Sequence, residues 1–188
     1  VAWFRINRRL VERYKAFHRL AILKPGGNMD RAYTAIATPT LNHFSHDLTV
    51  KAKYNALDVC VGREKEIEEI FSSLAGGHNG VLLVGPAGVG KRTIIGGVAQ
   101  LMVEENVPSF LKDKRLVELD VPRLVSGVSP AAAQERLLAS INEVSRSGNI
   151  ILYISNIENL IGISAGSEES LDLSEVLSEA IARRNIFC

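Results

Sequence analysis

Residues 85–91, Gly85-Pro86-Ala87-Gly88-Val89-Gly90-Lys91, are the part of this sequence that decides the fold. Two glycines are separated by four residues, and a lysine directly follows the second one. Glycines let successive backbone N–H groups turn toward an anion, and the lysine reaches the outer phosphates of a nucleotide. A helical pattern follows, and a helix that begins here adds its positive N-terminal end to the site. The stretch predicts a nucleotide-phosphate-binding loop; a tight glycine turn that holds no nucleotide is the alternative.

The segments around this loop alternate between short apolar runs and longer stretches with helical spacing. A continuous apolar run is typical of a strand buried on both faces, and apolar residues at steps of three and four indicate one face of a helix. Strands are therefore predicted at residues 81–84, 115–119, 149–155 and from 186, and helices at 64–74, 91–105, 130–146 and 171–184. This alternation indicates a parallel sheet with helices on both faces. We expect an α/β fold, the three-layer α/β/α arrangement of P-loop NTPases.

Positions that normally bind the metal ion of such a site differ here. The loop lysine is usually followed by Ser or Thr, whose hydroxyl binds Mg²⁺, but here the next residue is Arg92. Thr93 stands one residue later, about 100° around the helix, and is expected to point away from the metal. The strand at 149–155 ends in Ser155 and Asn156, where a carboxylate pair normally holds Mg²⁺ and polarises the attacking water. The sequence predicts weak or absent hydrolysis, a doubtful dependence on Mg²⁺ and no catalytic residue; Glu158 is interpreted as a surface residue.

Six segments, in this order, resemble the first nucleotide-binding domain of the Clp-type AAA+ unfoldases and disaggregases. They extend from about Leu41 to Cys188 and read LNHFSHDLT, LDVCVGRE, GPAGVGKRTIIGGVAQ, NVPSFLKDKRLVELDVPRLVSG, IILYISNIENLIG and SEVLSEAIARRNIFC. The resemblance implies the AAA+ large subdomain, a lead-in helix over residues 41–49, ATP as the cofactor, and a backbone at LDVCVGRE that packs on adenine. The candidate cofactor-binding residues are therefore Val61, Gly62, Gly85, Pro86, Ala87, Gly88, Val89, Gly90, Lys91, Arg92 and Thr93.

The resemblance also implies partners and an incomplete domain. Homo- or hetero-oligomeric ring subunits are expected as partners and a polypeptide as substrate, although residues 127–137, which match the family's pore loop, lack its aromatic residue. In the family the fourth strand lies between the first and the third, so a chain that stops at Cys188 is expected to have an incomplete sheet and to be part of a longer protein. We predict an ATP-binding subunit of a Clp-like chaperone or unfoldase with weak or absent hydrolysis at this site. The alternative is a membrane-linked or scaffold module that no longer uses nucleotide.

Charge divides the chain into a basic leader and a mildly acidic remainder. Residues 1–56 hold ten Lys and Arg against three Asp and Glu, whereas the remaining residues hold twelve against eighteen. We predict a basic amphipathic helix over residues 1–27, a linker with the lead-in helix over 28–56, and the AAA+ domain over 57–188. The basic helix either contacts a membrane surface through residues 1–24 or docks on another domain or subunit.

Other classes of partner and setting are disfavoured by composition. The balanced total charge argues against nucleic-acid binding. No run approaches the roughly 18 apolar residues that a transmembrane helix needs. Two cysteines far apart in sequence, Cys60 and Cys188, fit a cytoplasmic setting, at the cytosolic face of a membrane if the basic helix binds one. His43 and His46 stand three residues apart without further metal ligands nearby in the sequence, so no metal site is expected.

Overall fold

The computed structural model describes residues 36–112, 114–161, 173–183 and 186–188. The predicted basic helix, residues 1–27, and the first part of the predicted linker, residues 28–35, therefore lie outside the described residues. The elements in chain order are α3 (Pro39–His43), β1 (Ser45–Asp47), α4 (Leu48–Lys53), α5 (Glu64–Ala75), α6 (Lys91–Val103), the 3-10 helix η1 (Ser109–Leu111), β2 (Arg115–Leu119), α7 (Val121–Val125), α8 (Pro130–Ser147), β3 (Ile150–Ile154), α9 (Glu158–Ile161) and α10 (Leu173–Ala182).

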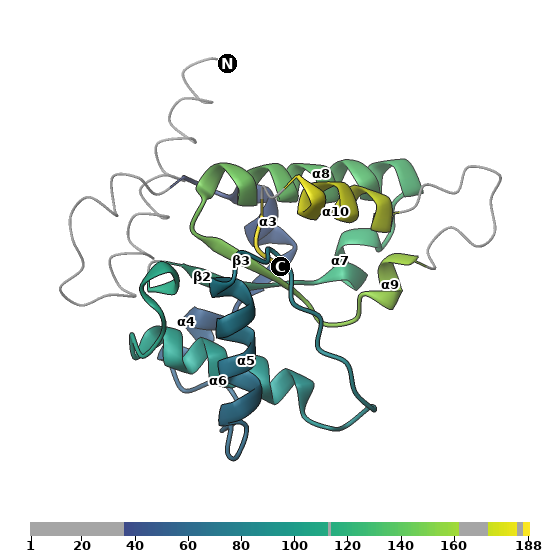
Figure 1. The fold of residues 1–188 in the computed structure, drawn as a ribbon. Helices are drawn as coiled ribbons and strands as arrows, with labels where there is room; N and C mark the ends of the chain where they lie inside the picture. The colour runs from purple at the N-terminus through teal and green to yellow at the C-terminus, as the bar shows by residue number, and fades with distance from the viewer. Residues whose placement is uncertain (1–35, 113, 162–172, 184–185) are drawn as a thin grey trace.

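The predicted three-layer α/β/α arrangement is confirmed. The sheet has the order β1-β2-β3, and β2 runs parallel to β3 with Arg115 opposite Ile150 and Leu119 opposite Ile154. Figure 1 shows α8 and α10 on one side of these strands and α4, α5 and α6 on the other. Each side has its own apolar core: Val117 and Leu119 pack under α8 and α10, and Leu116 packs under α6. Alternate residues of a strand point to opposite faces, so the three apolar residues of β2 serve both cores: Leu116 one, and Val117 and Leu119 the other.

The last described residues lie between β3 and the segment that precedes the phosphate loop. Phe187 forms a parallel bridge with Ile151, and its carbonyl accepts a hydrogen bond of 2.8 Å from Leu152 N. On the other side, Val81 N donates to the Cys188 carbonyl at 2.9 Å, and Cys188 N donates to the Asn79 carbonyl at 2.8 Å. Residues 186–188 thus stand where the resemblance puts a fourth strand, between the first and the third.

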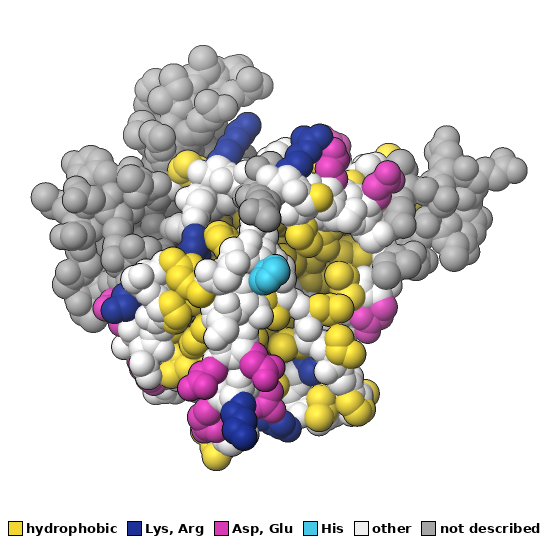
Figure 2. Space-filling view, in the orientation of Figure 1, with side chains coloured by type: hydrophobic (Ala, Val, Ile, Leu, Met, Phe, Trp, Pro, Cys, Tyr) yellow, Lys and Arg dark blue, Asp and Glu magenta, His cyan; other side chains and the backbone are white. Residues whose placement is uncertain are grey.

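The prediction of a buried strand at residues 81–84 is wrong for this structure. The segment is extended but belongs to no strand, and the exposed fractions of Leu82 and Val84 are 70% and 84%. Its described pairing partner ends at Cys188, opposite Val81, so no described segment offers backbone groups to residues 82–84. An apolar run reports a tendency to be buried, whereas a strand also needs a neighbour to share its hydrogen bonds. Figure 2 shows hydrophobic side chains exposed on this face of the molecule, between the two helical layers.

The expected lead-in helix over residues 41–49 is interrupted, which is a second correction. It consists of α3, the short strand β1 and α4, and β1 pairs antiparallel with β2 so that Ser45 lies opposite Leu119. Asp47 ends the strand and starts the next helix, because its Oδ1 accepts a hydrogen bond from Val50 N at 3.0 Å. Leu41 and Phe44 are buried, so the C-terminal part of the predicted linker is packed structure. The division of the chain at residues 27 and 56 stays a prediction.

The remaining helix predictions are confirmed within one or two residues at most ends. Within the part of the chain that the structure describes, no helix is long and apolar enough to cross a membrane.

Candidate nucleotide site

The phosphate loop turns through backbone conformations that require glycine. Gly88 and Gly90 have φ of +79° and +95°, in the left-handed region that side chains with a Cβ rarely adopt. Gly90 is the N-cap residue of α6, so the first free N–H groups of that helix lie at the end of the loop. The sequence GPAGVGK therefore forms the turn between residues 81–84 and α6 that the spacing predicts.

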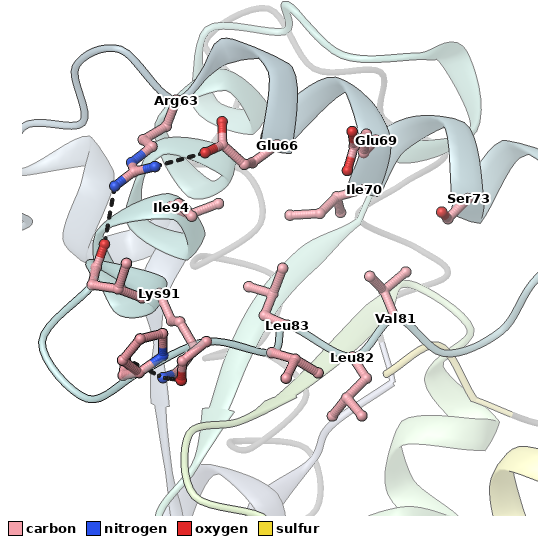
Figure 3. A pocket seen from close by; sticks show the side chains of 14 residues that line it. Arg63, Glu66, Glu69, Ile70, Ser73, Val81, Leu82, Leu83, Lys91 and Ile94 are labelled. Atoms are coloured by element: carbon pink, nitrogen blue, oxygen red, sulfur yellow. Dashed lines mark hydrogen bonds and ion pairs between the residues drawn. The ribbon is translucent and has the colours of Figure 1, made fainter.

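Lys91 folds back over this turn. Its Nζ donates hydrogen bonds to the carbonyl oxygens of Gly85 at 2.7 Å and Pro86 at 3.0 Å. Figure 3 shows the lysine beside the loop, at one end of the cavity described next. The Lys91 ammonium group is therefore held by two backbone carbonyls of the loop itself.

A cavity of about 470 Å³ lies between α5 and the chain that leads into the loop. Figure 3 shows Ile70 of α5 facing Val81 and Leu83 across it, whereas Leu82 points away from α5. Four of the predicted site residues line it, and they are Gly85, Pro86, Val89 and Lys91. The lining also includes Arg63, Glu66, Glu69 and Ser73, so polar and apolar groups are mixed along the cavity.

Arg63 connects α5 to the loop and was missed by the sequence reasoning. Its Nη2 donates to the Val89 carbonyl at 3.1 Å, and its Nη1 lies 2.7 Å from Glu66 Oε1. The hydrogen bond from Arg63 lowers the pKa of the Glu66 carboxyl below its usual value. The signal available in the sequence was its place directly after Gly62, in the segment that resembles an adenine-contacting motif.

The other predicted residues are dispersed around the loop. Val61 is 80% exposed, and Gly62 has φ of +70° with its N–H directed to Glu64 Oε1 at 3.3 Å. Neither residue lines a described cavity, nor do Ala87, Gly88, Gly90 and Thr93. A Cβ placed on Gly90 would lie 4.0 Å from Thr93 Oγ1, so that hydroxyl faces back toward the loop. Nucleotide contacts by all eleven predicted residues, including the four that line the larger cavity, stay predictions.

A second, smaller cavity of about 190 Å³ lies at the carboxyl ends of β2 and β3. Arg92 lines it, together with Ser155 and Asn156, so the three residues that replace the usual metal-binding set do share one space. The other ionisable groups around it are His46, Glu118 and Asp120, and His46 Nε2 lies 3.5 Å from Asp120 Oδ2.

Glu118 also lines this cavity, although the sequence did not predict it as a site residue. Its carboxylate is 5% exposed, and its Oε2 lies 2.9 Å from Arg92 Nη2. Tyr153 stands opposite Glu118 in the sheet, and burial, reinforced by the charge of Glu118, raises the pKa of its phenol. A buried carboxylate needs a partner of opposite charge, and Arg92 supplies it.

The residues at this position do not fit a Mg²⁺ ion. The hydroxyl that should bind the ion is replaced by the guanidinium of Arg92, a permanent cation. Ser155 and Asn156 carry no carboxylate, and both carboxylates that line the cavity are engaged: Glu118 with Arg92, and Asp120 with the backbone N–H of Arg123 and the ring of His46. Among the described residues, no group of three His, Cys, Asp or Glu side chains could hold a metal ion.

Comparison with known proteins identifies a family for the fold and the phosphate loop. The model of a family described as ATPase family associated with various cellular activities (AAA) matches residues 81–186. The chain is 40% identical over 153 residues to the ATP-dependent Clp protease ATP-binding subunit ClpC of Staphylococcus epidermidis, and equally to that of Staphylococcus aureus. Each match covers 80% of this chain and 19% of the relative, so the chain spans about a fifth of the length of these proteins.

Solved structures of a yeast protein show the same fold. The S. cerevisiae Hsp104-ADP complex superposes with a TM-score of 0.66 at 32% identity, over 77% of this chain and 25% of that one. The S. cerevisiae Hsp104:casein complex in its extended conformation gives a TM-score of 0.67 at 30% identity, over 78% of this chain and 25% of that one. From its phosphate loop, its three-layer fold and these matches, the chain belongs to the AAA family of ATPases and is related to the Clp-type members ClpC and Hsp104.

Proposed function

We propose that this chain is the first ATP-binding domain of a Clp-like chaperone or unfoldase subunit and that it hydrolyses ATP weakly or not at all. The observation that carries the proposal is the contrast within one site. Gly88, Gly90 and Lys91 keep the geometry that binds phosphate, while Ser155 and Asn156 stand where the hydrolytic carboxylates belong.

Binding and hydrolysis depend on different groups, so one can persist without the other. Backbone N–H groups at the start of α6 and the Lys91 ammonium supply phosphate contacts without any carboxylate. Hydrolysis also needs a group that orients the attacking water, and asparagine cannot act as a general base. Loss of one well-placed catalytic group costs about 10²–10³ in rate, so we expect turnover at least about a hundredfold below that of a complete site.

An ATP titration tests the binding half of the proposal. We expect Lys91→Ala to weaken ATP binding by about tenfold or more, because it removes a charged hydrogen-bond donor to phosphate. Lys65→Ala is the matched control, since Lys65 is an exposed lysine on α5 that lines neither cavity. Equal ATP affinities of the native protein and the Lys91→Ala variant would show that this loop does not bind the nucleotide.

Phosphate release under single-turnover conditions tests the hydrolysis half. We expect the native protein to release phosphate at a rate close to the spontaneous one, and the triple change Arg92→Thr, Ser155→Asp, Asn156→Glu to raise it. Rapid release by the native protein that is lost in Lys91→Ala would refute weak hydrolysis.

Assembly, substrate and location belong to the same proposal. One of the similar structures is a complex of Hsp104 with casein, and the ClpC relatives are subunits of a Clp protease. We propose ring subunits, of this chain or of related chains, as partners, a polypeptide as the substrate of the whole assembly, and a cytoplasmic location. Sedimentation of the protein with ATP checks the assembly: a particle that remains monomeric with its partner subunits present would contradict it. Contact of residues 1–24 with a membrane surface stays a prediction.

A scaffold module that has lost nucleotide use is the second candidate. It is favoured by the engagement of Arg92 with Glu118 and by the exposed apolar side chains of Leu82 and Val84. The same titration separates the two functions, because a scaffold would bind ATP no better than Lys91→Ala.

A further inference from the structure

We propose that the Arg92–Glu118 ion pair takes the place of Mg²⁺ in this nucleotide site, so that ATP is bound in its metal-free form. The inference rests on the proposed function, because it concerns how the same loop holds the nucleotide. It extends that function by naming the ionic form of the ligand and the residue that positions the substitute cation.

The position of Glu118 in the sheet makes this replacement geometrically reasonable. Glu118 and Tyr153 are opposite each other in the β2–β3 register, so their side chains share one face. Leu116 and Ile151, two residues earlier on each strand, pack in the core under α6, so this is the face that α6 covers. The carboxylate of Glu118 therefore lies on the α6 side, near the end of the neighbouring strand, and shares a cavity with Ser155.

Compared with a metal-binding site of this kind, the positive and the negative charge are supplied by different groups here. In a metal-binding site of this kind, a neutral hydroxyl on the helix and a carboxylate at the end of the third strand hold a cation between them. Here the helix residue, Arg92, is itself the cation, and the carboxylate comes from β2. The bridge between helix and sheet persists, but it consists of a direct contact of 2.9 Å between Arg92 Nη2 and Glu118 Oε2.

Arg92 retains the capacity to bind phosphate while it holds Glu118. A guanidinium has five N–H donors in a planar fork, and the contact with Glu118 uses Nη2. The side chain of Arg92 is 68% exposed, whereas that of Glu118 is 5% exposed, so the arginine is anchored at one side and open at the other. Glu118 is thus a positioning residue: it fixes the direction of the guanidinium and does not itself face the nucleotide.

The charge balance favours ATP without a metal. Lys91 and Arg92 both lie in the first turn of α6, where the helix dipole is also positive, and Glu118 offsets the Arg92 charge in part. A Mg²⁺ ion would have to approach the guanidinium. Of the two carboxylates that line the cavity, Glu118 is paired with Arg92, and Asp120 contacts His46 and the Arg123 N–H. Mg²⁺ bound to ATP also removes negative charge that Arg92 and Lys91 would otherwise attract.

Calorimetric titration of ATP with excess EDTA and with excess MgCl₂ tests the proposal. We expect the native protein to bind ATP at least as tightly in EDTA as in MgCl₂. The variants are Arg92→Thr, Arg92→Lys, Glu118→Gln and the double change Arg92→Thr, Glu118→Gln. The double change removes both charges, and it is included because Arg92→Thr alone leaves a buried carboxylate without its partner. Thermal unfolding of each variant confirms that it is folded, and Arg146→Thr, an exposed arginine on α8, is the matched control.

Each variant has a distinct expected result. The double change should weaken binding in EDTA by about tenfold, the usual effect of losing one charge-assisted hydrogen bond, and make binding respond to Mg²⁺. Arg92→Lys should keep the indifference to Mg²⁺ at lower affinity, because it keeps the charge and loses the fork. Glu118→Gln should weaken binding in EDTA by a few fold, and a purely structural role of Glu118 would instead lower stability without changing the ratio of the two affinities.

The outcomes separate this inference from the proposed function. Native binding that is tightened about tenfold or more by Mg²⁺ would overturn the inference and leave the proposed function standing. An unchanged response to EDTA in the folded double variant would also overturn it. Absence of ATP binding in both conditions, with no effect of Lys91→Ala, would overturn the proposed function and this inference with it.

Discussion

The clearest test of how α6 packs is the contrast between two adjacent glycines in its interior, Gly96 and Gly97. Both are buried. A Cβ added to Gly97 would lie 2.9 Å from Cys60 Cβ, 3.0 Å from Cys60 Sγ and 3.0 Å from Ile67 Cδ1. A Cβ added to Gly96 would meet nothing closer than the Asp58 carbonyl at 3.7 Å. The helix therefore has room for alanine at the first position and none at the second.

The expected magnitudes follow from two opposing effects. Either Gly→Ala change raises helix propensity by about 1 kcal/mol. At Gly97 the added methyl group also forces the segment around Cys60, or the α5 side chain of Ile67, to move, which costs about 1–3 kcal/mol. We expect Gly96→Ala to be neutral or stabilising and Gly97→Ala to be less stable than it by about 1–3 kcal/mol. In a domain of this size the difference corresponds to roughly 2–12 °C in Tm.

Circular dichroism during thermal unfolding measures this difference directly. A rescue variant makes the test specific: Cys60→Gly removes two of the three close contacts, so combined with Gly97→Ala it should show a favourable coupling of about 1 kcal/mol. Equal Tm values for Gly96→Ala and Gly97→Ala would refute the reasoning, because the two changes differ in the space available and in little else.

Four further predictions concern the loop, the helix ends and one thiol. Glu143→Ala should lower the free energy of unfolding in urea by about 1–3 kcal/mol, because the carboxylate accepts hydrogen bonds of 3.1 and 2.9 Å from the first backbone N–H groups of α3; no change would contradict this capping role. Gly90→Ala should cost about 1–2 kcal/mol through its φ of +95° and should also weaken ATP binding, and an unaltered affinity would show that the loop tolerates a Cβ. Arg63→Ala should weaken ATP binding by about two- to fivefold, a modest effect because its contacts are exposed, and Lys65→Ala should have none. Burial raises the pKa of the Cys188 thiol to about 11, so it is protonated at pH 8, and maleimide labelling should accelerate as pH rises toward that value; labelling as fast as that of an ordinary thiol at pH 8 would contradict its burial.

Much of the fold was predictable because it depends on local patterns. The strand at residues 150–154 is a continuous apolar run, the strand at 115–119 has three apolar residues among its five, and α5, α6, α8 and α10 have apolar residues at helical spacing. These signals depend on which faces an element buries, and both faces of the sheet are buried here. The phosphate loop was predictable for a different reason, since its chemistry requires particular residues at fixed spacing.

The errors occurred where structure depends on a partner distant in sequence. Ser45, His46 and Asp47 are polar and have no strand pattern, and they form β1 because the outer edge of β2 offers hydrogen bonds. Residues 82–84 have a strand pattern but no described neighbour beyond Val81. In both cases pairing, and not apolar character, decides the outcome.

The candidate site was only partly predictable for the same reason, because its contacts join residues that are distant in sequence. Arg92 was recognised as a departure from the usual residue, but its partner Glu118 is 26 residues away on another element. A single acidic residue within an apolar strand gives no periodic signal, and its contact with Arg92 depends on the position of α6 above β2. Arg63 escaped notice because its role, a hydrogen bond to a loop carbonyl, leaves no pattern in the sequence.

The short antiparallel strand β1 has a consequence for the behaviour of the whole chain in solution. It covers the outer edge of β2, which would otherwise present a row of unpaired N–H and C=O groups to any passing polypeptide. Its three residues are polar, so β1 can face water without favouring pairing with a further strand. Asp47 also fastens it to Arg115 at the start of β2, with 3.0 Å between Oδ2 and Nε. By pairing with β2, β1 reduces the tendency of chains to aggregate through that edge. An assay of nucleotide binding or hydrolysis does not measure this contribution.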